Sequence, residues 1–281
     1  MARKKEEKRT AAPDEVKPPQ KVDETPYEFV ASICSVLVVG LFILTFLAQN
    51  FVIPSGSMEN TLLIGDHLMV DRITLAPPAR WMPLMHYREP KRGDIVVFIK
   101  PVIDPTLDVD SSGYPTHTIL VKRLIGVPGD HIKLHEGVVF INGVAQTPPP
   151  DSINPTAANF DPYRDEFPAV EPVPQDGGVM ESWALELRSV VKDGELVVPE
   201  GKYFMMGDHR TNSLDSRYWG FVPRENIMGR PVINYWSFDA SEDEMTQQGN
   251  QGIGGILQWM GHVALHFFDK TRWSRTLHLV K

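Results

Sequence analysis

The chain has 281 residues, of which 42% are hydrophobic and 23% are charged, and this balance excludes a mainly disordered protein. The formal net charge is −8, so no global basic surface indicates nucleic-acid binding. The single cysteine, Cys34, excludes an intrachain disulfide and a cysteine-rich zinc site. Because Cys34 lies in the most apolar segment of the chain, we expect a buried structural thiol rather than a nucleophile.

That apolar segment covers residues 29–48 and carries no charged side chain. At about 1.5 Å per residue it spans roughly 30 Å, the thickness of a hydrocarbon core, so we predict one transmembrane helix. Residues 1–28 are polar and rich in lysine and arginine, and no basic residue follows the segment until Arg72. We therefore expect a disordered cytoplasmic tail and an extracytoplasmic body. The alternative is a cleavable signal peptide, although its apolar part is usually only about 7 to 15 residues long.

Short β-branched and aromatic runs dominate the body of the chain. Strands are predicted near residues 93–100, 116–126, 195–206 and 229–239, with two strands and a turn over 61–74. Asn142-Gly143 between apolar residues predicts a hairpin. Connections are short and rich in proline, so we expect a mainly β catalytic domain formed by 49–146 and 191–240, with a loop-rich, proline-rich insertion over 147–190.

The C-terminal part, residues 241–281, is predicted to be a linker followed by an amphipathic helix. Apolar residues recur at helical spacing between Ile253 and Phe268. Packing against the β domain is the favoured interpretation. The alternative is contact with a membrane surface, which would suit the residues just beyond the helix: Lys270, Arg272, Trp273 and Arg275.

Several kinds of catalytic site are disfavoured by the motifs that the chain lacks. It contains nine histidines but no G-x-S-x-G elbow for a Ser-His-Asp triad. The histidine pairs at 131/135 and 262/266 lack the glutamate of H-E-x-x-H, so no metal is expected. A serine can also be activated by a neutral lysine, which requires burial of the amine. In the strand TILVKRLIG, alternation places Leu120 and Leu124 on the face of Lys122, although a strand lysine alone more often lies at a solvated edge.

Four stretches resemble the conserved boxes of bacterial type I signal peptidases (leader peptidases), in the order found in that family. They are IPSGSM (53–58), RGDIVVF (92–98), VKRLIGVPGD (121–130) and GDHRTNSLDSRYWGFVP (207–223), and the resemblance covers about residues 50–236. It implies a serine protease with Ser57 as nucleophile and Lys122 as general base. It also implies that Ser55 and the backbone N–H of Ser57 hold the oxyanion, and that Ser213 orients the lysine amine.

The resemblance extends to supporting residues, substrate and location. It implies ion pairs Asp215–Arg217 and Asp208–Arg123, and shallow pockets that select Ala-x-Ala and are lined by Phe51, Ile53, Met58 and Val121. It implies no cofactor, no nucleic acid, and as partners the signal peptides of exported preproteins and the lipid bilayer. A single-pass, monomeric protein of the bacterial inner membrane is expected, with its N-terminus cytoplasmic. His209 and Thr211 depart from the commonest family pattern.

Two alternatives differ from this interpretation in class. A self-cleaving repressor of the SOS-response type shares a Ser/Lys dyad and a related β fold, but it is soluble and binds DNA. An inactive membrane-tethered binding module would be expected to lose Ser57 or Lys122, and both are present.

Overall fold

The structure is a computed structural model, and it describes residues 25–76, 87–104, 118–172, 178–245 and 252–280. The chain divides into two compact units, residues 1–41 and 42–281. The predicted tail over 1–28 lies almost entirely outside the described residues. The second unit contains every predicted site residue.

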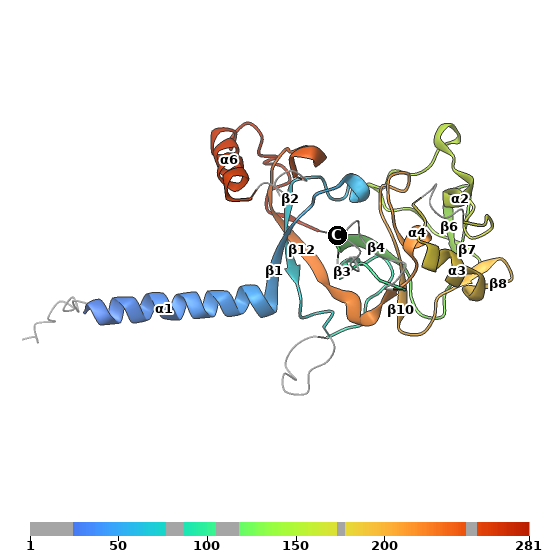
Figure 1. Cartoon of the computed structure of the whole chain (residues 1–281), viewed down its shortest axis with the longest axis horizontal. Helices are drawn as coiled ribbons and strands as arrows, with labels where there is room; N and C mark the ends of the chain where they lie inside the picture. Colours follow the sequence, from blue (N-terminus) through green and yellow to red (C-terminus); the bar gives the residue numbers. More distant parts are fainter. Residues whose placement is uncertain (1–24, 77–86, 105–117, 173–177, 246–251, 281) are drawn as a thin grey trace, which may run out of the picture. The chain divides into compact units, whose positions relative to one another are not determined.

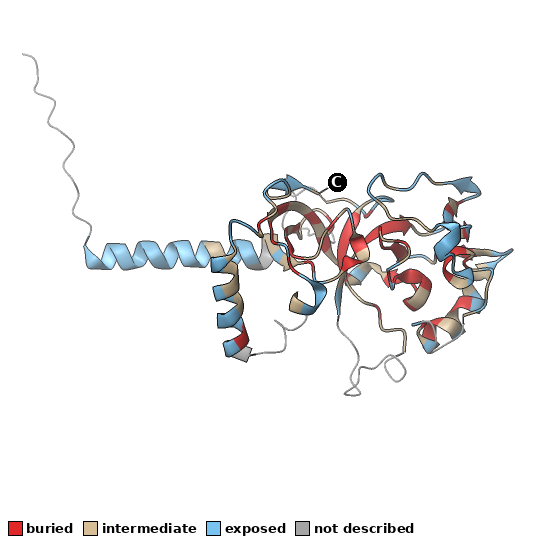
Figure 2. Cartoon of the chain, turned by 90° about the horizontal axis from the view of Figure 1, so that it is seen from above, coloured by how far each residue is buried: buried red, intermediate tan, exposed pale blue. Residues whose placement is uncertain are grey.

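Helix α1 (Pro26–Phe42) forms most of the predicted apolar segment. A π-helical turn, η1 (Ile43–Leu47), follows it, and Ala48 already belongs to strand β1. Within the described part of the chain, no helix combines the length and the apolar character needed to cross a membrane. The transmembrane helix over 29–48 therefore stays a prediction. The expectation of a buried Cys34 is wrong, because Cys34 is exposed on a helix that has no buried residue (Figure 2).

The larger sheet is an antiparallel assembly of eight strands at the centre of the second unit (Figure 1). Its order is β1-β2-β12-β3-β4-β10-β11, and β13 also pairs with β12. The strands are β1 (Ala48–Val52), β2 (Asp66–Asp71), β3 (Ile95–Ile99), β4 (Ile119–Gly126), β10 (Lys202–Met206), β11 (Val222–Pro223), β12 (Ile227–Ser237) and β13 (His278–Leu279). Only one of the two strands expected over 61–74 is present, because the turn at Gly65 brings β2 against β1 instead.

The smaller sheet has five strands in the order β7-β6-β5-β9-β8. They are β5 (His131–His135), β6 (Val138–Ile141), β7 (Val144–Ala145), β8 (Val191–Lys192) and β9 (Glu195–Val197). Asn142 and Gly143 both have positive φ angles in the turn between β6 and β7, as an Asn-Gly hairpin requires. The mainly β prediction and the Asn-Gly hairpin are confirmed.

The two sheets share an apolar core. Ile125, Phe204 and Met206 of the larger sheet pack with side chains of the smaller sheet, including Ile132 and Leu196. On the opposite face of β4 and β10, Leu124 and Met205 pack in a second cluster with Val96, Phe98 and Trp219. Alternation along β4 therefore gives its two faces different neighbours.

The proline-rich segment over 147–190 contributes to the core as well as forming loops. It contains η3 (Ala157–Asn159), α2 (Pro162–Asp165) and α3 (Glu181–Val190). Phe167 and Trp183 from this segment are fully buried in the core between the sheets. The large aromatic side chains order the segment despite its prolines, because their burial removes extensive apolar surface from water.

Helix α6 (Gly252–Leu265) matches the predicted amphipathic helix. Trp259 and His262 contact the ring of Phe238, whereas Leu257, Met260 and Leu265 are exposed (Figure 2). Beyond α6, two of the basic residues that favoured membrane contact are tied to the β domain instead: Arg272 pairs with Asp239, and Arg275 pairs with buried Asp66.

Candidate active site

Ser57 and Lys122 lie in contact, although 64 residues separate them in the sequence. Ser57 lies in a single 3-10 turn, η2 (Gly56–Met58), which the chain forms directly after Pro54 and Ser55. Lys122 lies in the middle of β4, paired with Val96 of β3. The Lys122 Nζ and the Ser57 Oγ are 2.5 Å apart. This is hydrogen-bond distance for transfer of the serine proton to the amine.

The surroundings of Lys122 favour the neutral form of its amine. Its side chain is only 3% exposed, and Leu124 on the same face of β4 is fully buried. Burial lowers the pKa of the Lys122 amine to about 8; the negative charge of Asp215 raises this pKa, and the positive charge of Arg217 lowers it. A large fraction of the amine is therefore neutral at mildly alkaline pH, as a general base must be.

The loop after β10 holds Ser57 from the other side. The backbone N–H of His209 donates to the carbonyl oxygen of Ser57 at 3.2 Å. A Cβ atom on Gly207 would lie 2.4 Å from that carbonyl oxygen and 2.3 Å from the Oγ of Ser213. Only glycine permits this approach of the loop to Ser57.

We expect Gly207→Ala to displace Ser57 and to lower preprotein cleavage at least tenfold, because overpacking of this kind costs about 1 to 3 kcal/mol. The thermal transition and the initial rate of cleavage would be measured together. Gly254→Ala in α6 is the control, since its Cβ would meet nothing within 4 Å. Unchanged cleavage by Gly207→Ala would show that the close approach is not needed.

The two other predicted catalytic serines lie beside the dyad. Ser55 directly precedes η2 and is half-buried. The Ser213 hydroxyl is buried, and among the described residues it has no hydrogen-bond partner. The bond from Ser213 to Lys122 that the resemblance implies is therefore not formed in this structure, in which the lysine Nζ is directed to Ser57.

Both ion pairs that the resemblance implies are present, and both are bidentate. The Nε and Nη2 of Arg123 donate to Asp208 at 2.8 and 2.7 Å. The corresponding atoms of Arg217 donate to Asp215 at 2.8 and 2.7 Å, and neither side chain of this pair is exposed. Asp215 also accepts from the backbone N–H of Gly207, so this pair fixes the loop that contacts Ser57.

Sequence reasoning missed several residues that complete this network. Thr61 donates to Asp208 at 2.6 Å, and Arg164 forms a third buried bidentate pair with Asp165. Trp183 and Tyr163 both donate to the backbone carbonyl oxygen of Arg217. The signal available was the stretch DPYRDEF, in which charged and aromatic residues alternate between prolines.

The four residues predicted to line the substrate pockets differ in how much surface they leave for a ligand. Ile53, Met58 and Val121 belong to one apolar cluster, together with Leu68 and Ile95. Ile53 and Met58 are almost fully buried, at 3% and 1% exposed. Phe51, on β1, and Val121, next to Lys122 on β4, are half-buried. Of the four residues, Phe51 and Val121 therefore offer the most surface to a ligand.

Comparison with known proteins agrees with this geometry. The family profile described as "Signal peptidase, peptidase S26" matches residues 27–236. The chain belongs to this family. It is accordingly a serine protease. The matched region includes Ser57, Lys122 and the three buried ion pairs, and it ends within β12, before α6.

Relatives in this family share about a third of their residues with the chain. A signal peptidase I of Pseudomonas fluorescens is 32% identical over 255 residues, which cover 85% of this chain and 82% of the relative. A probable signal peptidase I-2 of Synechocystis sp. is 30% identical over 214 residues, 76% of this chain and 75% of the relative. A crystal structure of a signal peptidase I from Enterococcus faecalis covers 51% of this chain and 97% of its own, at 28% identity and a TM-score of 0.28.

Proposed function

We propose that the chain removes N-terminal signal peptides from exported preproteins, with Ser57 as nucleophile and Lys122 as general base. The observation that carries this proposal is the 2.5 Å contact between the Ser57 hydroxyl and a buried amine of lowered pKa. Burial removes the water that would otherwise stabilise the ammonium form, and the neutral amine can then accept the serine proton.

In the proposed mechanism the Ser57 Oγ attacks the scissile carbonyl carbon while Lys122 takes its proton. The resulting oxyanion would be held by the backbone N–H of Ser57 and the hydroxyl of Ser55. Lys122 would return the proton to the leaving amine, and then deprotonate the water that hydrolyses the acyl-enzyme. Ser213, buried beside Gly207 without a partner, is available to hold the amine once Lys122 leaves Ser57.

The substrate preference would follow from the apolar surface beside the dyad. Phe51 and Val121 are only half-buried, whereas Ile53 and Met58, which pack in one cluster with Val121, are almost fully buried. Side chains larger than alanine at positions −1 and −3 would overlap these residues, which gives the Ala-x-Ala preference.

We further propose that residues 29–48 anchor the protein in the bacterial inner membrane, with the N-terminus cytoplasmic and the catalytic domain outside. The absence of charge over this segment and the lysine and arginine residues before it support this topology. The exposed apolar residues of α6 are compatible with a second contact to lipid. We expect the protein to act as a monomer.

The decisive experiment is cleavage of an Ala-x-Ala preprotein by the purified full chain in detergent. Ser57→Ala should abolish cleavage while the thermal transition stays near that of the wild type, because only the nucleophilic oxygen is removed. Ser189→Ala, which alters an exposed serine of α3, is the matched control. Processing by Ser57→Ala at the wild-type rate would overturn the assignment.

A further inference from the structure

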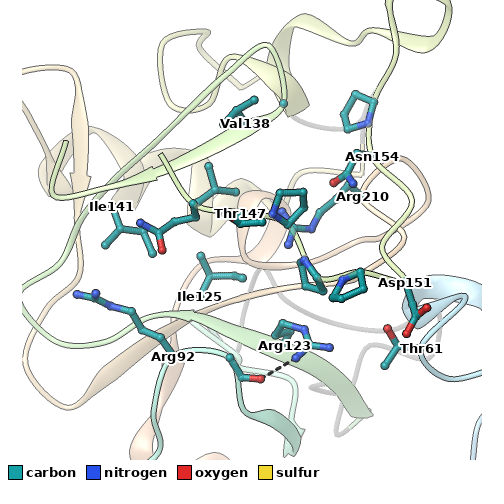
Figure 3. Close-up of a pocket in the computed structure, with 18 of the residues that line it drawn as sticks. Thr61, Arg92, Arg123, Ile125, Val138, Ile141, Thr147, Asp151, Asn154 and Arg210 are labelled. Carbon is teal, nitrogen blue, oxygen red and sulfur yellow. Dashed lines mark hydrogen bonds between the residues drawn. The ribbon is translucent and has the colours of Figure 1, made fainter. Parts of the chain in front are cut away.

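A pocket of about 740 Å³ is lined by residues of β4, among them Arg123 and Ile125 (Figure 3). Its walls come from both sheets and from the proline-rich segment, and they include Val139 and Ile141 of β6, Pro149 and Arg210. The walls are mainly apolar. The proposed catalytic mechanism uses no part of this pocket.

The arginines that line the pocket differ in their partners. They are Arg92, Arg123 and Arg210. Arg92 pairs with Asp130, and Arg123 pairs with Asp208. Arg210 is the one of the three that has no ion pair among the described residues.

Arg210 is only 3% exposed, and its Nε is buried without a hydrogen-bond partner. It forms no ion pair with any carboxylate of the described residues. Its side chain reaches into the pocket beside Asn154 and Thr147 (Figure 3). A buried charge without a partner is costly, so a pocket that contains one is suited to a ligand that supplies the opposite charge.

The other pocket residues restrict what that ligand can be. Asp151 and Glu136 also line the pocket and disfavour a ligand with more than one negative charge. The prolines and the valine and isoleucine side chains favour an apolar body next to the charged group. A planar carboxylate matches the fork of N–H donors that a guanidinium presents.

We propose that this pocket binds a small organic carboxylate with an apolar body, whose carboxylate pairs with Arg210. The ligand is either a short-chain carboxylic acid or the C-terminal carboxylate of a short apolar peptide. The lowered pKa of Arg210, about 10, is consistent with this, because burial and the positive charge of Arg217 destabilise the guanidinium more than the negative charges of Asp208 and Asp215 stabilise it. The proposal does not rest on the Ser57 and Lys122 chemistry.

The test is calorimetric titration of the purified full chain in detergent, with titration into detergent alone subtracted. Isobutyrate and its near-isosteric amide isobutyramide form one pair of probes, and acetyl-valyl-alanine and its C-terminal amide form the other. We expect at least one acid to bind about 10- to 100-fold tighter than its amide, as loss of a charge-assisted hydrogen bond implies. The tighter acid identifies the source of the carboxylate.

Arg210→Met should remove this preference for the acid, whereas Arg210→Lys should retain part of it. Arg188→Met is the matched control, because Arg188 is an exposed arginine of α3 paired with exposed Glu171. Equal binding of acid and amide by the wild type, no binding of either acid, or an unchanged preference in Arg210→Met would overturn the proposal. If Arg210→Met does not fold, the wild-type comparison and Arg210→Lys still decide it.

Discussion

Replacing Lys122 by methionine is expected to lower cleavage of an Ala-x-Ala preprotein by at least about 10³-fold, because the serine loses the amine that contacts its hydroxyl. Methionine has nearly the length of lysine and fits the apolar side of the site, where Leu124 is fully buried. Lys122→Arg should be as inactive, since a guanidinium cannot be deprotonated in a protein. Initial rates at saturating enzyme measure both effects.

The matched control is Lys133→Met. Lys133 is also a strand lysine, but its side chain is 43% exposed and pairs with Glu195 on the smaller sheet. Its removal should leave cleavage unchanged, because exposed pairs contribute little. Cleavage by Lys122→Met within tenfold of the wild-type rate would show that another group acts as the base.

The pH dependence of cleavage follows from the direction in which the pKa of Lys122 is shifted. Its pKa is lowered to about 8 by burial, so wild-type cleavage should rise with pH and level off above about 8. In the unfolded chain the amine keeps its ordinary value near 10.5, so between pH 8 and 10.5 the unfolded state binds more protons than the folded state. Below pH 8 the charged, buried amine therefore lowers the free energy of unfolding. This destabilisation disappears as the pH rises towards 10.5.

Thermal unfolding tests this reasoning independently of activity. Lys122→Met should unfold at a higher temperature than the wild type at pH 7, where the buried amine is charged. The difference should shrink by pH 9.5. A lower unfolding temperature for Lys122→Met at pH 7 would contradict the inferred penalty.

The strands and the dyad could be predicted because their signals are local. GDIVVFIK and THTILVKRLIG have β-branched runs with clear ends, and they became β3 and β4. Alternation placed Lys122 among apolar neighbours, and its contact with Ser57 followed from the resemblance to a known family. The structure adds the distance and the burial that make this contact chemically useful.

The third buried ion pair and the pocket could not be predicted in this way. They depend on contacts between distant residues, which no hydrophobic periodicity or motif in the sequence indicates. Nothing local shows that Arg164, in a proline-rich segment, is buried and donates to the backbone carbonyl oxygen of Thr211. Nor could pattern reasoning show that Arg210 is the one buried arginine of the described residues that forms no ion pair, because pairing depends on how the loops fold. Arg275 illustrates the same limit: it supported the alternative of membrane contact, and it pairs with Asp66 of β2.

The ion pair between Asp215 and Arg217 should be the most sensitive point of this network. Both side chains are fully buried, so Asp215→Asn leaves a guanidinium without a counterion in the interior. Breaking a buried pair in this way costs about 3 to 5 kcal/mol. At about 2 to 4 °C per kcal/mol, we expect the thermal transition to fall by roughly 6 to 20 °C. Asparagine keeps the shape of the side chain and one acceptor oxygen, so the measurement isolates the charge.

Glu171→Gln is the control for Asp215→Asn, since Glu171 and Arg188 form a pair of the same chemistry at the surface. This change should shift the transition by no more than about 4 °C, because exposed pairs contribute roughly 0 to 1 kcal/mol. The double change Asp215→Leu with Arg217→Met should be less destabilising than Asp215→Asn alone, because it removes the charge together with its partner. An Asp215→Asn protein as stable as the wild type would show that Arg217 finds another counterion or solvent.

The same substitution also separates a structural role from an effect on the dyad. Asp215 is the principal negative charge that raises the pKa of Lys122, and Arg217 lowers it. Loss of the aspartate charge should therefore lower the pKa of the amine further. The midpoint of the pH–rate profile should move to lower pH in the folded fraction of Asp215→Asn, measured below its thermal transition. If the ion pair were only structural, Asp215→Asn would reduce the amount of active protein and leave the midpoint of the pH–rate profile unchanged.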